Sequence, residues 1–321
     1  MIELTPANIK LWSTVGSRAT FGLVALELGR SYEDLMIITA DTSTSAGLDR
    51  FKRTFPSKFL DVGIAEQNMI GIAAGLASEG FTVYTSTFAP FQSMRGCEQI
   101  RMNLAHMQHR ITMVGLASGL VQGALGFSHC CTEDIAILRG IGGVAVISPA
   151  DATETAQAVW AAARYPSPSY IRLTGGTKNP IVNHGPYVFE IGKSITLREG
   201  RDVAIFASGM MVYESLMAAE ALEKQGVAAS VVNMHTIEPL DVEAVRHACT
   251  YARLIVTVEE HGLVGGLSSA VAEIKSRSPL APPQLSIALS RSHVTHVDYR
   301  QALALNGLTA EGIAAKILAH R

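Results

Sequence analysis

Short apolar runs alternate along this chain with longer segments whose apolar residues recur at helical spacing. In the first half the runs lie at 35–39, 82–85, 111–116, 144–147 and 170–173. Runs of this length between helical segments predict βαβ units, whose strands join into a parallel sheet. The chain is therefore expected to adopt an α/β fold that is rich in parallel sheet.

The alternation stops once and then starts again. The stretch from Asn179, which reads Asn-Pro-Ile-Val-Asn-His-Gly-Pro, is rich in turn formers and has no period. Beyond it we expect strands at 203–207, 228–233 and 254–258, and helices at 213–224 and from Leu267. A length of 321 residues also exceeds the ~250 to 300 at which one hydrophobic core usually stops growing. We predict two α/β domains, the first over 1–178 and a smaller second over 192–321, joined by a linker over 179–191.

Composition and charge exclude several classes of function. Hydrophobic residues make up 48% and charged residues 17% of the chain, which is typical of a folded globular protein. The formal net charge of −2 provides no basic field for nucleic acid or acidic membranes. The N-terminus lacks the features of a signal peptide, and the most apolar stretch, 113–127, is short and rich in glycine. We expect a cytoplasmic protein that binds neither nucleic acid nor membrane.

The cysteines and the common motifs narrow the chemistry further. The four cysteines, Cys97, Cys130, Cys131 and Cys249, show no C-x-x-C spacing and are expected to be reduced thiols. No strand is followed by G-x-G-x-x-G, and the sequence contains no G-x-x-x-x-G-K-[ST], H-E-x-x-H or G-x-S-x-G. Binding of a nucleotide by the usual phosphate loops is therefore not expected.

The densest chemical signal lies at 61–80, where Asp-Val-Gly-Ile-Ala-Glu-Gln-Asn-Met is followed by a run of small residues. A strand is expected to end near Val62 and a helix to begin around Glu66. That arrangement puts a carboxylate where strand and helix meet, the usual location of α/β sites. Spacing alone favours a simpler interpretation, a first-turn glutamate stabilised by the helix dipole.

The whole string resembles the pyrimidine-binding domain of the transketolase family of thiamine diphosphate enzymes, whose motif runs D-x-G-I-x-E-x-x-M before a small-residue helix. The similarity continues through 84–91, 98–101, 128–136, 148–151 and 170–173, and beyond the linker through 207–209, 232–234, 239–241 and 258–267. It spans nearly the entire chain, but only the latter half of a full transketolase.

The family holds the cofactor's diphosphate and its Mg²⁺ with a Gly-Asp-Gly motif followed by an Asn, and no Gly-Asp-Gly occurs in this sequence. The resemblance therefore implies the C-terminal subunit of a split transketolase, which ligates no metal itself. An N-terminal-type subunit would hold the diphosphate and Mg²⁺. The expected assembly is an α2β2 heterotetramer around a homodimer core, acting on small sugars at a site between chains.

The resemblance also implies roles for individual residues. Glu66 matches the catalytic glutamate at the cofactor's N1′, a position that requires an acidic group. Phe88 and Phe91 match aromatic residues around the aminopyrimidine, with Phe91 at the stacking position, and Met94 replaces a third aromatic. His129 matches the catalytic histidine that contacts the donor's hydroxyl.

Other implied positions concern the rim of the site and the acceptor. Asp41 matches a residue that lines the cofactor site, and Arg18 and Ser45 match positions that hold the acceptor's phosphate. His261, in the second domain, is expected to be structural.

Three substrate positions depart from the family pattern. Ala117 replaces a histidine, Leu125 replaces the acid four residues before His129, and Gly175 replaces the arginine that closes an L-x-R motif. The missing groups are ones that discriminate strongly between substrates. The cofactor half of the site is therefore expected to be kept and the acceptor half to be altered.

Two alternatives stay open at this point. The β component of a 2-oxo-acid dehydrogenase decarboxylase shares this pair of domains, although Ser128-His129 with Glu133-Asp134 favours transketolase. A non-catalytic regulatory subunit of the same fold is the other. Glu66 argues against it, because a buried carboxylate without a function costs stability.

Overall fold

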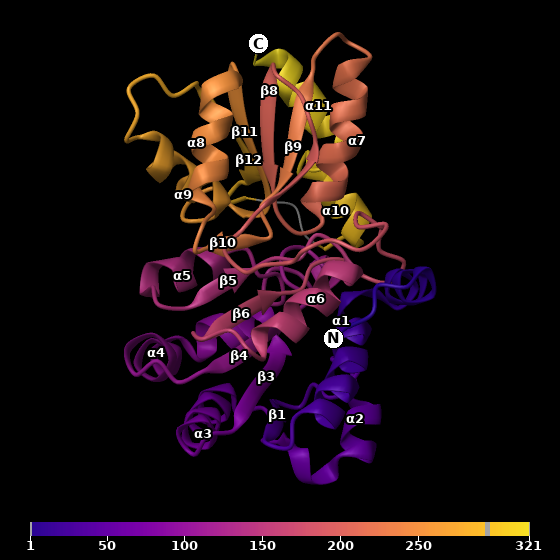
Figure 1. The fold of residues 1–321 in the computed structure, drawn as a ribbon, viewed down its shortest axis with the longest axis vertical. Coiled ribbons are helices and arrows are strands. Elements are labelled where there is room, and N and C mark those ends of the chain that lie inside the picture. Colours follow the sequence, from indigo (N-terminus) through magenta and orange to yellow (C-terminus); the bar gives the residue numbers. More distant parts are fainter. Residues whose placement is uncertain (1, 293–295, 321) are drawn as a thin grey trace.

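The computed structural model describes residues 2–292 and 296–320, and it shows two α/β units stacked along the long axis of the molecule (Figure 1). Each unit is built on its own sheet, one of seven strands and one of five. Most neighbouring strands are parallel, so the α/β fold expected from the sequence is confirmed.

The first sheet has the strand order β10-β5-β6-β4-β3-β1-β2. Its edge strand β10 runs antiparallel to β5. Helices α1 and α6 cover one face, and α3, η3 and α5 cover the other. The elements of this unit are α1 (Pro6–Ser31), β1 (Leu35–Thr39), α2 (Asp49–Thr54), η1 (Pro56–Lys58), β2 (Phe59–Asp61), α3 (Glu66–Ser78), β3 (Thr82–Phe88), η2 (Phe91–Arg95), α4 (Cys97–Gln99), η3 (Ile100–His106), β4 (Ile111–Leu116), η4 (Gly123–Leu125), α5 (Asp134–Ile141), β5 (Ala145–Ile147), α6 (Ala152–Ala162) and β6 (Ser169–Arg172).

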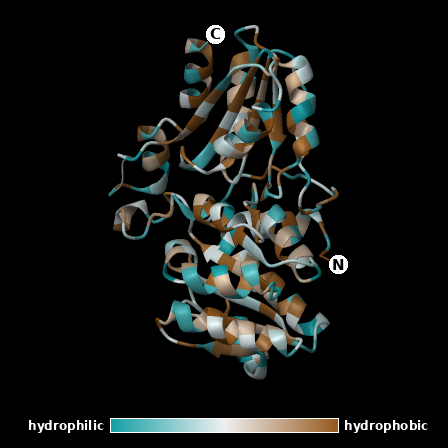
Figure 2. Ribbon diagram, turned by 90° about the vertical axis from the view of Figure 1, so that its left-hand side faces the viewer, coloured by the Kyte–Doolittle hydropathy of each residue, from teal (hydrophilic) through white to brown (hydrophobic). Residues whose placement is uncertain are grey.

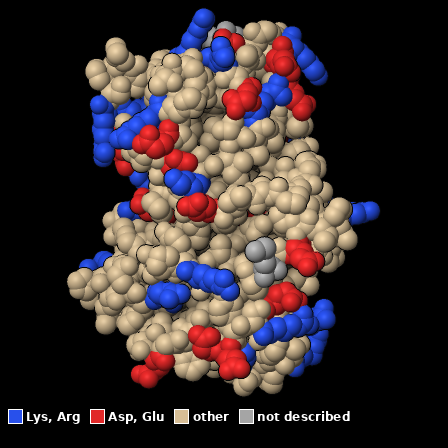
Figure 3. Space-filling view, viewed as in Figure 1, with Lys and Arg blue, Asp and Glu red and all other residues tan. Residues whose placement is uncertain are grey.

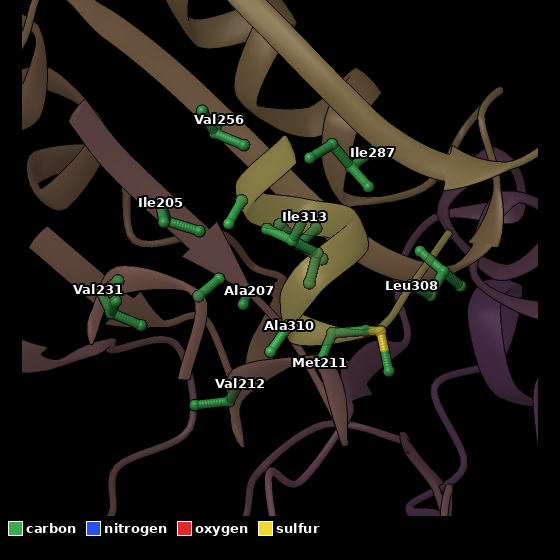
Figure 4. Packing of buried hydrophobic residues seen from close by; sticks show 14 of the residues in the cluster. Ile205, Ala207, Met211, Val212, Val231, Val256, Ile287, Leu308, Ala310 and Ile313 are labelled. Atoms are coloured by element: carbon green, nitrogen blue, oxygen red, sulfur yellow. The ribbon is translucent and has the colours of Figure 1, made fainter. Parts of the chain in front are cut away.

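The second sheet has the order β12-β11-β8-β9-β7, with β7 antiparallel to β9. Successive residues of β8 face opposite sides, as strand geometry requires. Val203, Ile205 and Ala207 pack against α7 and α11 (Figure 4), whereas Ala204 and Phe206 pack against α8 and α9. The elements are β7 (Ile195–Arg198), β8 (Val203–Ala207), α7 (Met211–Glu223), β9 (Ala229–Asn233), α8 (Val242–Tyr251), β11 (Leu254–Gly262), α9 (Leu267–Lys275), β12 (Gln284–Leu289), α10 (Tyr299–Leu305) and α11 (Ala310–Ala319). The strand β10 (Thr236–Glu238), which lies between β9 and α8 in the sequence, belongs to the first sheet.

Every strand expected from the apolar runs is present, with ends displaced by at most a few residues, and α3 begins at Glu66 as predicted. Sequence reasoning missed β7, β10 and β12. Each lies at the edge of its sheet, where one side of the strand needs no buried partner and the apolar signal is weak. β10 belongs to the first sheet although it follows β9 of the second, so the chain crosses between units more than once.

The segment Tyr299–Ala319 is apolar enough over its 21 residues to cross a membrane by length and composition. In the structure it forms two helices, α10 and α11, with Asn306 ending the first and Thr309 capping the second. Ala302, Leu303 and Ile313 pack into the cluster beneath the second sheet. This packing explains the apolar character of the two helices. The strands of the second sheet are also rich in hydrophobic residues (Figure 2).

The surface carries both signs of charge. On the face seen in Figure 3, acidic and basic residues are interspersed.

Buried carboxylates join the two units. Asp151 caps α6 and accepts hydrogen bonds from the backbone N–H groups of Val182 and Asn183, both at 2.8 Å. Glu154, in the first turn of α6, accepts from the backbone of Ala150 at 2.6 Å and from the Asn233 amide of the second unit at 2.8 Å. Burial, reinforced by the nearby charge of Asp151, raises the pKa of Glu154 to about 8.

This raised pKa predicts a pH dependence of stability. In the unfolded chain the carboxyl ionises near its ordinary pKa of 4.5, so between 4.5 and about 8 the folded state holds a proton that the unfolded state releases. Raising the pH through this window should therefore lower the free energy of unfolding. Glu154→Gln, whose side chain cannot ionise, should weaken this fall, while Glu220→Gln on the exposed face of α7 should not. Urea denaturation at several pH values between 5 and 8 measures the free energy of unfolding of each variant. The prediction is contradicted if this free energy falls equally with pH in wild type and in Glu154→Gln.

Candidate active site

The carboxyl ends of four neighbouring strands bring the expected cofactor residues to one edge of the first sheet. The strands β4, β3, β1 and β2 are adjacent and parallel. Asp41 follows β1, Glu66 follows β2, Phe88 ends β3 and Ala117 follows β4. Parallel strands end on the same side of a sheet, where ligands of open α/β folds bind. Positions that are separated in the sequence thus share one edge.

Asp61, the last residue of β2, organises this edge. Its Oδ1 accepts the backbone N–H of Asp41 at 2.9 Å and that of Gly63 at 3.0 Å. Asp41 and Gly63 both have positive φ, at +54° and +71°. One carboxylate therefore holds the backbone at both of these left-handed positions. Sequence reasoning did not single out Asp61, although it is the first residue of the D-x-G-I-x-E motif.

Glu66 opens helix α3 and is only 5% exposed. Its Oε1 accepts a hydrogen bond from Nη1 of Arg95 at 2.9 Å. The position at a helix N-terminus and the neighbouring cation both stabilise negative charge on this buried acid.

Phe91 lies at the centre of the predicted aromatic cluster. Its ring centroid is 6.4 Å from that of Phe88 and 5.6 Å from that of His129, with near-perpendicular rings in both cases. His129 Nδ1 also lies 3.0 Å from the hydroxyl of Ser128. Met94 is 38% exposed in the same π-helical segment, η2. The structure therefore brings Phe88, Phe91 and His129 together.

Arg95 connects this aromatic cluster to Glu66. Its guanidinium carbon stands 4.0 Å from the centroid of the Phe91 ring while Nη1 donates to Glu66. A planar group that bears N–H donors therefore already lies on an aromatic face and bonds a buried carboxylate. Sequence reasoning missed Arg95, because its only signal was a cation four residues after Phe91.

Arg18 and Ser45 share a separate pocket of about 230 Å³, which Thr44, Gly176 and Thr177 also line. Burial lowers the pKa of Arg18 below its ordinary value. The two residues predicted to hold the acceptor's phosphate are therefore side by side.

The three departures from the family pattern differ in their surroundings. Ala117 is buried and has a φ of +53°, whereas Leu125 is 57% exposed. Gly175 has a φ of +78°, and a Cβ added there would lie 2.8 Å from the Asn179 side chain and 3.0 Å from the sulfur of Met210. The positive φ of Gly175 and its close neighbours therefore leave no room for an arginine side chain at this position.

An apolar cavity lies beside the loop that carries Leu125 and His129. It has a volume of about 660 Å³ and lies between Phe127 and Glu133 on one side and Leu263, Val264 and Leu289 of the second unit on the other. His261 is buried behind it, with Nε2 accepting the backbone N–H of Ala136 at 3.3 Å. This contact gives His261 a structural position between the units.

Within residues 2–292 and 296–320, no group of three or more His, Cys, Asp or Glu side chains is arranged to hold a metal ion.

Comparison with known protein families identifies both units. Residues 13–177 match the family described as "Transketolase, pyrimidine binding domain", and residues 192–313 match "Transketolase, C-terminal domain". An apulose-4-phosphate transketolase subunit of Phocaeicola vulgatus is 36% identical over 95% of this chain and 97% of its own length. A putative transketolase C-terminal section of Methanocaldococcus jannaschii is 38% identical over 94% of this chain and 95% of its own.

Further relatives extend this picture. A 6-deoxy-6-sulfo-D-fructose transketolase subunit of a Clostridium species is 38% identical over 80% of this chain and 79% of its own. A 1-deoxy-D-xylulose-5-phosphate synthase of Synechococcus is 36% identical over 93% of this chain, which spans 46% of that longer protein.

Solved structures agree with the sequence relatives. A split-gene transketolase, solved as an inactive β4 tetramer, superposes with a TM-score of 0.85 at 36% identity, covering 95% of this chain and 97% of that one. Transketolase from Campylobacter jejuni shares the fold, with a TM-score of 0.79 at 20% identity over 95% of this chain and 46% of its own. The chain therefore belongs to the transketolase family, among the C-terminal subunits of split transketolases.

Proposed function

We propose that this chain is the C-terminal subunit of a thiamine diphosphate-dependent transketolase, which moves a two-carbon ketol unit from a ketose donor to an aldehyde acceptor. The observation that carries the proposal is the cluster of Glu66, Arg95, Phe91 and His129 at the carboxyl edge of the first sheet. It combines a buried acid, a stacking surface and a polar group for substrate. The relatives named as transketolase subunits support the same activity.

The residues at this edge fit the aminopyrimidine of the cofactor. Arg95 shows that a planar nitrogen-bearing group can lie on the Phe91 ring and bond Glu66 at the same time. Phe91 would stack on the pyrimidine, with Phe88 behind it, and Glu66 would hold a proton at N1′. With the cofactor bound, Arg95 would either lose its hydrogen bond to Glu66 Oε1 or share that oxygen with the pyrimidine. Thiamine diphosphate, when bound, supplies the nucleophilic carbon that attacks the donor's carbonyl.

The other predicted residues would orient the substrates. His129 would contact the donor's hydroxyl, and Asp41 would line the cofactor pocket from the end of β1. Arg18 and Ser45 share a pocket suited to an anionic group, because a guanidinium and a hydroxyl both bind phosphate oxygens. These assignments complete a site with a cofactor half and a substrate half.

A partner subunit would supply the diphosphate and Mg²⁺ site, since Gly-Asp-Gly is missing from this sequence. We infer an α2β2 assembly around a homodimer of this chain. The similar solved structure is a tetramer of β chains alone, and it is described as inactive. That description supports the need for a second type of subunit.

The first expected result concerns this dependence. The isolated chain should show no tight, Mg²⁺-dependent binding of thiamine diphosphate by isothermal titration calorimetry, because it lacks the metal motif. Adding the N-terminal-type subunit should restore binding. Micromolar, Mg²⁺-dependent binding by the isolated chain would refute the split-enzyme proposal.

A second expected result concerns Glu66. In the assembled enzyme Glu66→Gln should lower turnover by about 10²-fold or more, the usual effect of losing a positioned proton-transfer group. The matched control is Glu79→Gln at the exposed C-terminal end of the same helix, which should leave turnover unchanged. Circular dichroism and co-purification with the partner check that folding and assembly are kept. An unchanged rate of C2 proton exchange by NMR would contradict the assignment.

The acceptor preference gives a third expected result. Each lost charged hydrogen bond typically forfeits about 1.5 to 3 kcal/mol, so ribose 5-phosphate should be a poor acceptor unless Arg18, Ser45 or the partner subunit compensates. The exposed Leu125 and the apolar cavity beside it favour a less hydroxylated, larger or differently charged aldehyde, such as a modified or nucleotide-linked sugar. Values of kcat/KM across a panel of aldehydes test this. The donors should include apulose 4-phosphate and 6-deoxy-6-sulfo-D-fructose, which appear in the names of two relatives.

Leu125→Asp should improve the use of ribose 5-phosphate, because it restores an acid that can bind a sugar hydroxyl. Leu125→Asn, of similar shape but uncharged, is the matched control. Restoring an arginine at Gly175 is not a fair test, since a side chain there collides with Asn179. A wild type that clearly prefers ribose 5-phosphate would show that the altered positions are neutral.

A further inference from the structure

The loop that carries His129 is closed at its base. We call residues 117–133 the substrate loop; it joins β4 to α5 of the first unit. Gly119 and Cys131 pair across its neck, with Gly119 N–H donating to the Cys131 carbonyl at 2.8 Å and the reverse bond at 2.9 Å. Leu125 and His129 both lie within the closed part. Their positions therefore depend on what holds this loop.

The second unit packs against much of the substrate loop, in addition to the contacts that the loop makes with the first unit. Leu120 and Cys130 are buried in the hydrophobic cluster formed by β8, α7 and α11. The Gly123 carbonyl accepts the backbone N–H of His296 at 2.7 Å, and the Thr132 carbonyl accepts that of Gly262 at 2.8 Å. A loop from the first unit is thus anchored in the core of the second.

Glu260 of β11 ties the neck of this loop to the second unit through a buried carboxyl group. The side chain is 2% exposed. Its Oε1 accepts the backbone N–H of Leu120 at 2.6 Å, and its Oε2 accepts the hydroxyl of Tyr299 at 2.7 Å. Tyr299 starts α10, so the carboxylate connects the loop to the last helices of the chain.

The loop is shaped to receive this carboxylate. Gly119 has a φ of +68°, and a Cβ there would lie 2.2 Å from Oε1 of Glu260. Only glycine permits both the backbone conformation and the close approach. The contact is therefore built from both sides, by a glycine in the loop and an acid in β11.

We propose that Glu260 is a positioning residue, through which the C-terminal domain fixes the substrate loop and so sets where His129 and Leu125 meet the substrates. This role rests on the proposed function, in which those two residues face donor and acceptor. A buried carboxylate that accepts two hydrogen bonds is costly to release, because the N–H and O–H donors would be left unpaired. The second unit thus contributes to substrate binding without touching the substrate.

The first test measures the loop directly in the isolated full-length chain. Glu260→Met keeps the length of the side chain and removes both acceptor oxygens. Burial raises the pKa of Glu260 to about 7, with Arg172 opposing the shift, so a neutral form also fits the site and Glu260→Gln is the conservative variant. Glu214→Met is the comparison variant, because Glu214 is equally buried and accepts the backbone N–H of Ala310 at 2.8 Å and a hydrogen bond from the exposed Arg300 of α10, with no bond to the loop itself.

Hydrogen–deuterium exchange read by mass spectrometry should show peptides over 118–131 exchanging about tenfold faster or more in Glu260→Met, as expected for loss of a hydrogen bond to a charged group. Glu260→Gln should stay close to wild type. Glu214→Met should loosen the start of α11 and leave the loop unchanged. The proposal is overturned if Glu260→Met exchanges like wild type in this segment, or if Glu214→Met releases the loop equally.

A second variant covers the case in which Glu260→Met does not fold. Gly119→Ala places a methyl group against Oε1 of Glu260 and should also speed exchange over 118–131. Gly226→Ala serves as its control, because Gly226 has a similar φ of +72° and nothing within 4 Å of the added methyl. Wild-type exchange of the loop in Gly119→Ala would argue against the contact as the loop's anchor.

The second test uses the assembled enzyme with its partner subunit. Glu260→Met should lower kcat/KM for the preferred aldehyde by about tenfold or more, mainly through KM, with recovery in Glu260→Gln. Binding of thiamine diphosphate, followed by calorimetry, should not change, because Glu66 and Phe91 lie outside the loop. A loosened loop with wild-type kcat/KM would overturn the positioning role. A wild-type assembly without ketol transfer would instead refute the proposed function, while the exchange result still decides whether Glu260 holds the loop.

Discussion

The buried guanidinium of Arg172 is the group on which the arrangement of the two units depends, because it pairs with Asp134 within the first unit and also bonds β11 of the second. Both side chains are almost completely buried, at 2% and 0% exposure, so each charge needs its partners inside the protein. Arg172 Nε donates to Asp134 at 3.0 Å, and Nη2 donates to the carbonyl oxygens of Cys131 and Glu260. One guanidinium thus joins β6, α5, the neck of the substrate loop and β11. Sliding one unit over the other would break the bond to the Glu260 carbonyl and leave a buried guanidinium N–H unpaired, which strongly disfavours such movement.

The fixed placement of the units has a direct consequence for the candidate site. The residues that we propose to hold the cofactor, Glu66, Phe88 and Phe91, depend only on the first sheet, because they lie at or after the ends of its parallel strands. His129 contacts the Phe91 ring from the substrate loop. Two other residues of that loop, Leu120 and Cys130, are buried in the second unit. The part of the candidate site that we propose to bind substrate therefore depends on both units. The half that would hold the aminopyrimidine depends on one.

Two of the three positions that depart from the family pattern have a backbone conformation that disfavours the replaced side chain. Ala117 and Gly175 both have positive φ, and Gly175 is enclosed by Asn179 and Met210. Positive φ is costly for most side chains, and the space at 175 admits none. Leu125 is the exposed position of the three, so another side chain could replace it without a shift of the backbone.

The central strands, several helices and the place of Glu66 at the start of α3 could be predicted from the sequence. The periods of strands and helices are local signals, and the motif around Glu66 is continuous in the chain. The start of α3 and the aromatic residues at the end of β3 could therefore be predicted. The partners of these residues emerge only in the folded molecule. Arg95 meets Glu66 across 29 residues and Glu260 meets Leu120 across 140, and β10 joins a sheet formed mainly by the other half of the chain. Such pairings follow from the order of strands in the sheets and from the need to satisfy buried charges, and neither leaves a periodic signal along the sequence.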